Sequence, residues 1–336
     1  MDWRCTQNYV KAFANAEEVQ LRTSWRVNGF FGELYRIGAS EPIEWMEPDT
    51  GEILQCKPTA QYLRCSELKK QATEDIEAEL IKYGYRMKFP AKSADLNRRW
   101  CSAYLKICVA DSVIRNMDSL MKLADAGGQC FPAKGSTHEA GWCSGSLKAA
   151  VQNSVTPNLS LTRQDTRILV VSGERRGESA GRSRYNEMEW HRTNATVKSH
   201  RLVHLWRAVI DYSEADIWEV NKRHKVNPHP CYRCGWNRCS CAMCIFSMPS
   251  HFAGIREIMP EEYAQLRQDE IILGFTIDNR RDLDTYVGSA ESCVYHGDES
   301  ALRSLISGEF TVDDIYIEGP WKYPAGAFHG AEGGPC

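Results

Sequence analysis

The stretch "RILVVSGERRGESAGRSRY", residues 167–185, gives the clearest indication of the fold. It opens with a short β-rich apolar run that stops at a glycine, and a polar segment of helical character follows. A second apolar run, "RLVHLWRAVI" (201–210), precedes "SEADIWEVNKRH" (213–224), in which Ser213 and Asp216 form a capping-box pattern. Strands that alternate with helices favour a layered α/β fold with a mainly parallel sheet.

Other segments also show periodic patterns. Apolar residues at helical spacing predict a helix over 8–19, and a charged helix is predicted over 66–84. Two more helices are expected at 261–270 and 299–307, before a Gly/Pro-rich end. Residues 28–65 mix glycine, proline and short apolar runs, so we expect them to be mostly irregular.

An internal repeat interrupts this organisation. "FPAKSADLNRRWCSAYLKICVADSVIRN" (89–116) aligns without gaps with "FPAKGSTHEAGWCSGSLKAAVQNSVTPN" (131–158). Two copies are too few for a solenoid, so we interpret the second copy as a local duplication, and its extra glycines favour the first copy as the functional one. We therefore predict an α/β domain over 1–260 with an insertion at 121–165, and an extension over 261–336.

Composition and charge narrow the classes of function. The 336-residue chain has a formal net charge of −3, which argues against wholesale coating of nucleic acid. Residues 163–208, however, hold ten Lys/Arg against five Asp/Glu, a local surplus that suits an anionic ligand or a solvated basic face. No run of roughly eighteen apolar residues and no apolar signal core occur, so we expect a cytoplasmic protein without a membrane span.

Five of the fourteen cysteines lie within the segment 227–246, "NPHPCYRCGWNRCSCAMCIF". Thiolates two residues apart can reach one metal ion or one cluster iron from a tight turn. One interpretation is structural zinc, and its ligands are Cys231, Cys234, Cys241 and Cys244. A second is an iron–sulfur cluster that combines part of this set with distant cysteines, and a third is a group of buried reduced thiols.

Two further segments carry candidate chemistry. In 172–185 two glutamates alternate with four arginines after a predicted strand, where α/β proteins commonly bind ligands. Arginine forks suit phosphate or sulfate oxygens, although surface ion pairs would give the same pattern. In "RRWCSAYLK" (98–106) the cations near Cys101 favour thiolate chemistry or metal ligation. The histidines show no metal spacing, and we expect most of them to be structural.

Four segments together resemble the phosphoadenosine phosphosulfate (PAPS) reductase family of the N-type ATP pyrophosphatase superfamily. The matching segments, in family order, are "RRWCSAYLK" (98–106), "GERRGESAGR" (173–182), "LWRAVIDYSEADIW" (205–218) and "HPCYRCGWNRCSCAMC" (229–244). The resemblance covers most of residues 2–260. It implies a Rossmann-like fold of the adenine nucleotide alpha hydrolase type.

The resemblance also implies roles for residues that match the family's motifs. Lys106, Arg175 and Glu178 correspond to groups that handle the nucleotide or its anionic leaving group. The loop residues that would bind the nucleotide, ATP or an adenylyl-sulfate, are Gly173, Glu174, Arg175, Ser179 and Arg182. Some branches of the family bind a [4Fe–4S] cluster, and the ligands expected here are Cys101, Cys231, Cys241 and Cys244, with Cys234 and Cys239 as alternates and zinc as the alternative metal.

The chain departs from the family at one important motif. The phosphate-cradling PP-loop, "S-G-G-x-D-S", is not found in the sequence, and the resemblance begins downstream of that loop. We therefore expect the N-terminal βα unit to be missing, and a partner chain to supply the PP-loop or the sulfur.

Several functions remain open from the sequence. The first is an enzyme of sulfur metabolism, a transferase or an oxidoreductase, that adenylates a substrate, reduces an adenylyl-sulfate, or moves sulfur onto a nucleic acid. The alternatives are a non-catalytic binding protein stapled by a metal and an inactive paralogue.

Overall fold

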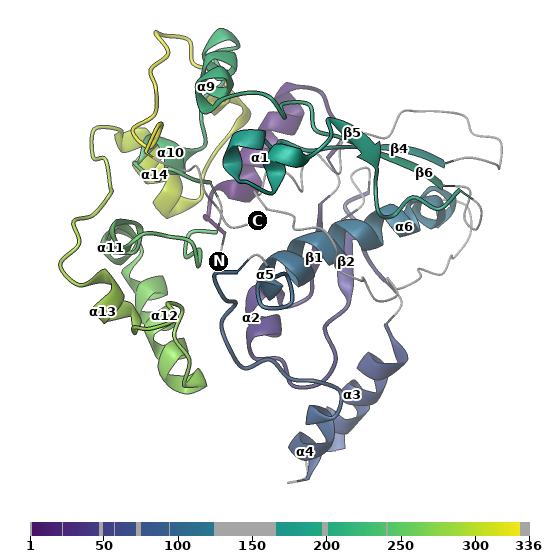
Figure 1. Ribbon diagram of the computed structural model, residues 1–336. Coiled ribbons are helices and arrows are strands. Elements are labelled where there is room, and N and C mark those ends of the chain that lie inside the picture. Colours follow the sequence, from purple (N-terminus) through teal and green to yellow (C-terminus); the bar gives the residue numbers. More distant parts are fainter. Residues whose placement is uncertain are drawn as a thin grey trace.

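The structure is a computed structural model, and it describes residues 2–21, 23–46, 50–56, 58–71, 75–93, 95–123, 166–196, 201–239 and 241–329 (Figure 1). Helices and small sheets are mixed along the chain, which confirms the mixed α and β class expected from the sequence. The second copy of the repeat, 131–158, lies outside the described residues. The Rossmann-like assignment and the domain boundary at residue 260 stay predictions.

The described elements have the following bounds. The helices are α1 Thr6–Ala16, α2 Gly29–Leu34, α3 Ala60–Gln71, α4 Ile76–Ile81, α5 Trp100–Ser102, α6 Cys108–Leu123, α9 Glu214–Arg223, α10 Pro230–Arg233, α11 Pro249–Ile258, α12 Pro260–Leu273, α13 Leu283–Val287 and α14 Glu299–Ser307. The strands are β1 Ser24–Arg26, β2 Ile43–Met46, β3 Ile53–Gln55, β4 Thr166–Val171, β5 Met188–Trp190 and β6 Arg201–Trp206. A π-helix, η1, spans Ala103–Ile107, and short 3-10 helices are η2 Arg176–Glu178, η3 Arg182–Arg184 and η4 Val312–Asp314.

The strands form two small sheets. The first has the order β1-β2-β3, and both of its pairs are antiparallel. The second has the order β4-β6-β5, in which β4 and β6 run parallel and β5 adds an antiparallel edge. The strands expected from the apolar runs at 167 and 201 are therefore confirmed, and they pair in parallel with each other. The other three strand pairs of the described residues are antiparallel, so the mainly parallel sheet that was expected is not seen among them.

Helix α6 packs between the two sheets. Its apolar face, which includes Val109 and Val113 one helical turn apart, belongs to the same buried cluster as Val170 of β4 and Val203 of β6. The same cluster contains Trp45 of β2, so both sheets contribute to it, and Figure 1 shows α6 running past both of them. Complete burial of each such side chain contributes about 1.5–3 kcal/mol, which explains why α6 holds the sheets together.

Some local expectations were wrong. Residues 28–65 were expected to be mostly irregular, but they contain α2, β2 and β3. The polar segment before residue 190 was expected to be helical, but Met188–Trp190 pairs with β6 as an edge strand, where the Trp190 ring stacks on His204 at 4.0 Å between centroids. Such pairing depends on a strand distant in sequence, so local periodicity does not reveal it.

The capping box predicted at the start of the helix after β6 is confirmed. The Ser213 hydroxyl accepts a hydrogen bond from the backbone N–H of Asp216, and the Asp216 carboxylate accepts one from the backbone N–H of Ser213. The two helices expected after residue 260 are also confirmed, as α12 and α14.

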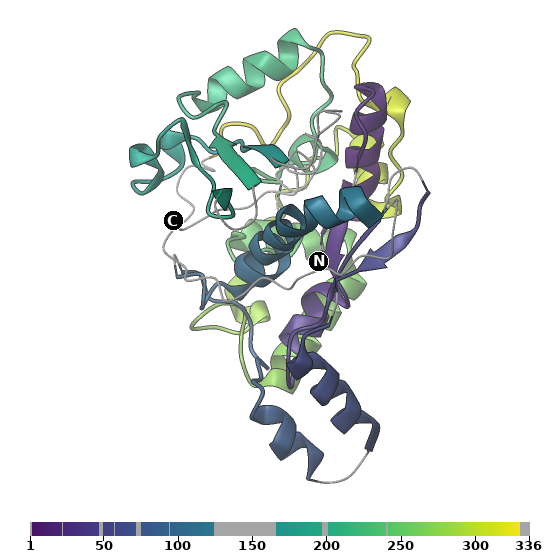
Figure 2. The ribbon, with the colours of Figure 1, turned by 90° about the vertical axis from the view of Figure 1, so that its right-hand side faces the viewer.

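The largest apolar core joins distant parts of the chain. It contains Trp3 from the N-terminal segment, Trp100 from α5, Trp236 from the cysteine-rich segment and Leu305 from α14. Helices α3 and α4 instead project away from the rest of the molecule, as Figures 1 and 2 both show. No helix in the part of the chain that the structure describes is both long enough and apolar enough to cross a membrane.

Candidate metal site and arginine loop

The first candidate site lies where α5 passes into α6 through a π-helix. Cys101 belongs to α5, and Lys106 belongs to the π-helix η1. A π-helix widens one turn by an extra residue, and such turns are frequent at functional sites. The segment "CSAYLK", which was singled out in the sequence, therefore has an irregular backbone in the structure.

Three thiols, those of Cys241, Cys101 and Cys244, lie near enough to the ammonium of Lys106 for their charges to act on it. Burial opposes the charged ammonium. The negative charges of Asp2 and of these thiols in their ionised form outweigh burial, so the pKa of Lys106 is raised. Burial raises the pKa of the Cys101 thiol, and it raises that of Cys241 to about 12, although Lys106 opposes both shifts. Without a metal ion these two thiols are therefore protonated at neutral pH, and metal ligation would release their protons.

Asp2 brings the N-terminal segment to this site. It forms an isolated antiparallel bridge with Cys241, and its charge acts on both Cys241 and Lys106. Trp3 next to it is buried against Trp236 with 4.8 Å between ring centroids, which holds the segment in place. No sequence pattern indicates a role for Asp2, because nothing local to residue 2 shows which distant loop it meets.

A second group of donor atoms lies in the same cysteine-rich segment. One ring nitrogen of His229 and the thiols of Cys231 and Cys239 lie within 4.8 Å of one another. The pKa of Cys239 is held well below its usual range, mainly by a hydrogen bond from Cys231. Burial raises the pKa of the Cys231 thiol. Burial opposes a charged imidazole at His229, but the neighbouring thiols outweigh it and raise the pKa of His229 to about 10.

The structure therefore divides the predicted ligand set. Cys101, Cys241 and Cys244 come together around Lys106, while Cys231 lies with Cys239 and His229. Cys234, an alternate in the sequence prediction, is buried, and its neighbours include Asp298 and Cys293. His229 was expected to be structural, and the signal that would have found it is the His-x-Cys spacing of "HPC".

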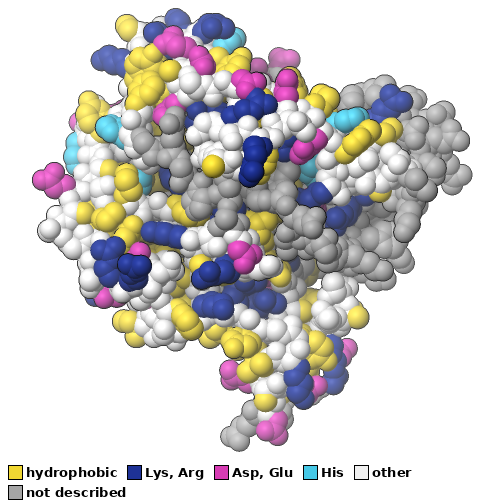
Figure 3. Space-filling model, in the orientation of Figure 1, with side chains coloured by type: hydrophobic (Ala, Val, Ile, Leu, Met, Phe, Trp, Pro, Cys, Tyr) yellow, Lys and Arg dark blue, Asp and Glu magenta, His cyan; other side chains and the backbone are white. Residues whose placement is uncertain are grey.

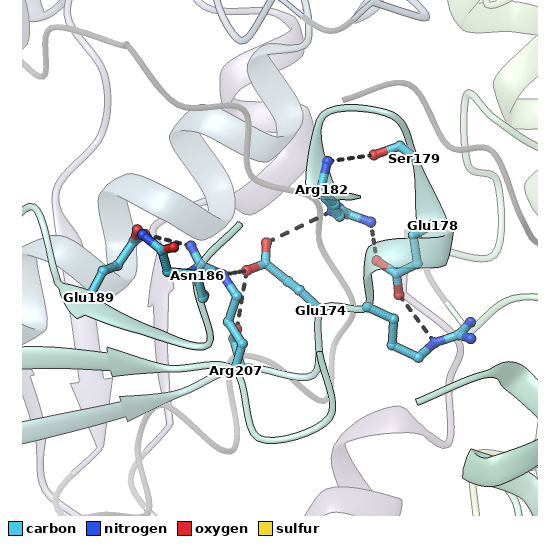
Figure 4. A network of polar contacts seen from close by, with 9 residues as sticks. Glu174, Glu178, Ser179, Arg182, Asn186, Glu189 and Arg207 are labelled. Atoms are coloured by element: carbon cyan, nitrogen blue, oxygen red, sulfur yellow. Dashed lines mark hydrogen bonds and ion pairs between the residues drawn. The ribbon is translucent and has the colours of Figure 1, made fainter. Parts of the chain in front are cut away.

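The arginine loop after β4 is built around Glu174, which has no exposed surface (Figure 4). Its carboxylate accepts a hydrogen bond from Nε of the buried Arg207 at 2.9 Å, and it lies 3.9 Å from Nε of Arg182. Ser172 Oγ also donates to it at 3.2 Å. In Figure 4 the carboxylate of Glu174 lies between the two guanidinium groups. Glu174 and Arg182 thus hold the loop together from inside.

The remaining predicted loop residues lie nearer the surface. Glu178 forms ion pairs with Arg175, at 3.8 Å, and with Arg182. The Ser179 hydroxyl accepts a hydrogen bond from the backbone N–H of Arg182 at 3.3 Å. No described atom lies within 4 Å of where a Cβ on Gly173 would stand, so the backbone is open on that side. The loop can therefore present backbone and a partly buried Arg175 to a ligand.

Part of the chain is similar to a phage protein. A 68-residue stretch is 32% identical to a protein named "Uncharacterized 37.8 kDa protein in gpa 5'region" from Escherichia phage 186, and the match covers 20% of this chain and 20% of that protein. No family model matches the chain, and no solved structure matches it.

Proposed function

We propose that this protein is a PAPS reductase-like protein that binds an adenylylated or other anionic sulfur substrate beside a [4Fe–4S] cluster. The observation that carries the proposal is the meeting of Cys101 with Cys241 and Cys244 around Lys106, from segments about 140 residues apart in the sequence. The family resemblance implies a ligand set of these three cysteines and Cys231, whereas Cys231 lies with Cys239 and His229.

Cys101, Cys241 and Cys244 would supply three of the four ligands of a [4Fe–4S] cluster, the fourth would come from outside this group, and the spread of the three thiols favours such a cluster over a single zinc ion. Thiolates on one zinc ion lie about 3.7 Å apart, because each Zn–S bond is about 2.3 Å long. In the described part of the chain, donor atoms within 4.8 Å of one another are found at His229, Cys231 and Cys239, so the thiols around Lys106 are more widely spread. A cubane cluster suits this wider spread, because each of its thiolates binds a different iron.

Lys106 would have two tasks in such a site. Its ammonium offsets the negative charge of nearby thiolates, and its raised pKa keeps it protonated at neutral pH. It also offers donors to an anionic group of the substrate. Figure 3 shows Lys and Arg side chains at several places on this face of the molecule, with hydrophobic and acidic side chains between them. When bound, the cluster would supply redox or electrostatic chemistry.

Anaerobic purification followed by iron analysis tests the cluster. We expect a brown protein with about four irons per chain, because thiolate ligation of a cubane gives visible absorption. Cys241→Ser should remove most of the iron and the colour, because it deletes a thiol that faces Lys106.

The matched control is Cys234→Ser, because Cys234 lies in the same segment but has Asp298 and Cys293 as neighbours. This variant should keep the iron. A colourless wild-type chain without iron, or an equal loss of iron in both variants, would contradict the proposal.

A second candidate function is a non-catalytic binding protein stapled by metal. The observation that favours it is the arginine loop, in which Glu174 and Glu178 form ion pairs with arginines inside the loop. Charge that is neutralised internally attracts an anion less strongly than free arginines would.

Ligand binding to the purified chain separates the two functions. If the protein acts on nucleotides, ATP or adenylyl-sulfate should bind at least about tenfold more tightly than inorganic sulfate. This ratio corresponds to a difference of about 1.4 kcal/mol in binding free energy. Arg175→Ala should remove that preference, while Arg184→Ala, at an exposed residue of the same loop, should keep it. Equal binding of nucleotide and sulfate in calorimetry would favour the non-catalytic protein.

A further inference from the structure

We propose that His229, Cys231 and Cys239 form a separate mononuclear site for zinc, distinct from the thiols around Lys106. The three donor atoms lie within 4.8 Å of one another, and His229 and Cys231 are buried while Cys239 is partly buried. This set shares no residue with Cys101, Cys241 and Cys244, so the inference does not depend on the iron–sulfur proposal.

The geometry is close to that of a zinc site. His229 Nδ1 lies 3.1 Å from Sγ of Cys231. In a tetrahedral site with Zn–N of about 2.0 Å and Zn–S of about 2.3 Å, these atoms would be about 3.6 Å apart. A shift of about half an ångström would therefore accommodate the ion. Imidazole with thiolates is a donor set that suits zinc.

The imidazole of His229 is already oriented for ligation through Nδ1. The backbone N–H of Cys231 donates to Nδ1 at 3.2 Å, so the lone pair of Nδ1 points toward Cys231, and a zinc ion bound there would replace this hydrogen bond. The other nitrogen, Nε2, lies 3.2 Å from the hydroxyl of Thr6 and can donate to it. Metal-ligating histidines commonly donate their other ring N–H in this way, which fixes the orientation of the ring. Thr6 would thus be a positioning residue.

The backbone turn at Gly235 lets the third ligand join the other two. Cys231 lies in the short helix α10, and the chain must reverse before Cys239 can come back beside it. Gly235 has φ +103°, and a Cβ there would lie 2.0 Å from the carbonyl oxygen of Cys293. Only glycine fits both the left-handed backbone and this close approach. The loop that carries Cys239 is therefore fixed by the fold.

The site has three protein ligands, and the fourth coordination position is left for water or another exogenous ligand. Cys5 lies near the imidazole, but its Sγ is 3.6 Å from Nε2, on the edge of the ring that faces away from Nδ1. The ring of Tyr9 also packs against His229, at 5.1 Å between centroids. Three protein ligands plus an exchangeable one is the arrangement of zinc sites that act on a bound molecule.

Metal analysis of the full chain from zinc-supplemented cells tests the inference. We expect about one zinc per chain. Cys239→Ser should lower the zinc affinity by more than the roughly 10–100-fold that outer-shell substitutions cost. Thr6→Val, which removes the hydroxyl near Nε2 but no ligand, should lower the affinity by roughly tenfold and leave the fold intact. Cys234→Ser is the control and should keep the zinc.

Cobalt gives a second measurement of the same site. Cys244→Ser removes a thiol next to Lys106, so this variant can be titrated with Co²⁺ without interference from an iron chromophore. We expect one Co²⁺ bound with the intense visible bands of tetrahedral thiolate coordination, and we expect Cys239→Ser in the same background to abolish them. The inference is overturned if these bands are absent, if they survive Cys239→Ser, or if Cys234→Ser removes them equally. Failure of the iron proposal alone would leave the zinc and cobalt results unchanged.

Discussion

Glu33→Gln is expected to lower the free energy of unfolding by about 3–5 kcal/mol, the cost of breaking a buried ion pair. Glu33 has no exposed surface, and three guanidinium groups share its carboxylate: Arg36 at 3.3 Å, Arg86 at 3.3 Å and Arg26 at 3.9 Å. Glutamine keeps the shape of the side chain but removes its charge. The three arginines would then lose the carboxylate that they share.

The effect should also reach the π-helix that carries Lys106. Arg86 lies over the rings of Trp100 and Tyr104, at 4.5 and 4.7 Å from their centroids, and Nε of Arg26 donates to the carbonyl of Tyr104. Burial lowers the pKa of Arg86, although Glu33 opposes that shift, so its charge is costly without the carboxylate. Loss of the ion pairs between Glu33 and its three arginines should therefore loosen the segment between Cys101 and Lys106.

Chemical denaturation measures this prediction, with Glu67→Gln as the control. Glu67 forms an ion pair with Arg64 at 3.6 Å, but both side chains are largely exposed, so its loss should cost less than about 1 kcal/mol. A double variant, Glu33→Gln with Arg86→Met, should recover part of the loss because it also removes one buried charge. Equal costs for Glu33→Gln and Glu67→Gln would contradict the prediction.

The second large effect is expected for Glu174→Gln, which should lower the free energy of unfolding by about 3 kcal/mol. Glu174 is fully buried between Arg207 and Arg182 (Figure 4), and Arg207 is itself only 1% exposed. The cost should be smaller than for Glu33, because each arginine keeps another carboxylate: Glu189 pairs with Arg207, and Glu178 pairs with Arg182. The variant should also release the loop that contains Arg175.

The control for this prediction is Asp211→Asn. Asp211 pairs with Arg176 of the same loop, but its side chain is 70% exposed, so its loss should shift the unfolding midpoint little. Limited proteolysis of the two variants gives a second readout, because a released loop is cleaved faster. If Glu174→Gln unfolds at the same denaturant concentration as Asp211→Asn, the loop does not depend on its buried carboxylate.

Local patterns predicted those elements that depend on neighbouring residues. The apolar runs at 167 and 201 became β4 and β6, and the capping box at Ser213 formed as expected, because periodicity and capping act over a few residues. The edge strand β5 and the strands β2 and β3 were missed. β5 is stabilised by pairing with β6, which follows it after a longer connection, whereas β2 and β3 pair with each other across a short one, and the three or four residues of each strand carry little signal.

The sequence by itself determined which residues can carry chemistry here. It singled out the cysteine-rich segment, the Cys101–Lys106 segment and the arginine loop as candidates, because these residue types at these spacings can hold a metal or an anion, although buried thiols and ion pairs give the same patterns. The family resemblance implied one ligand set of Cys101, Cys231, Cys241 and Cys244, but Cys231 lies with Cys239 and His229.

Only the tertiary structure decided how the thiols are divided. The turn at Gly235 returns Cys239 to Cys231 and His229, and the N-terminal segment brings Asp2 to Cys241 and Thr6 to His229. The spacing of five cysteines fixes how far each thiol can reach along the chain, but not which way it faces. That direction is set by backbone turns and by contacts with residues more than two hundred positions away.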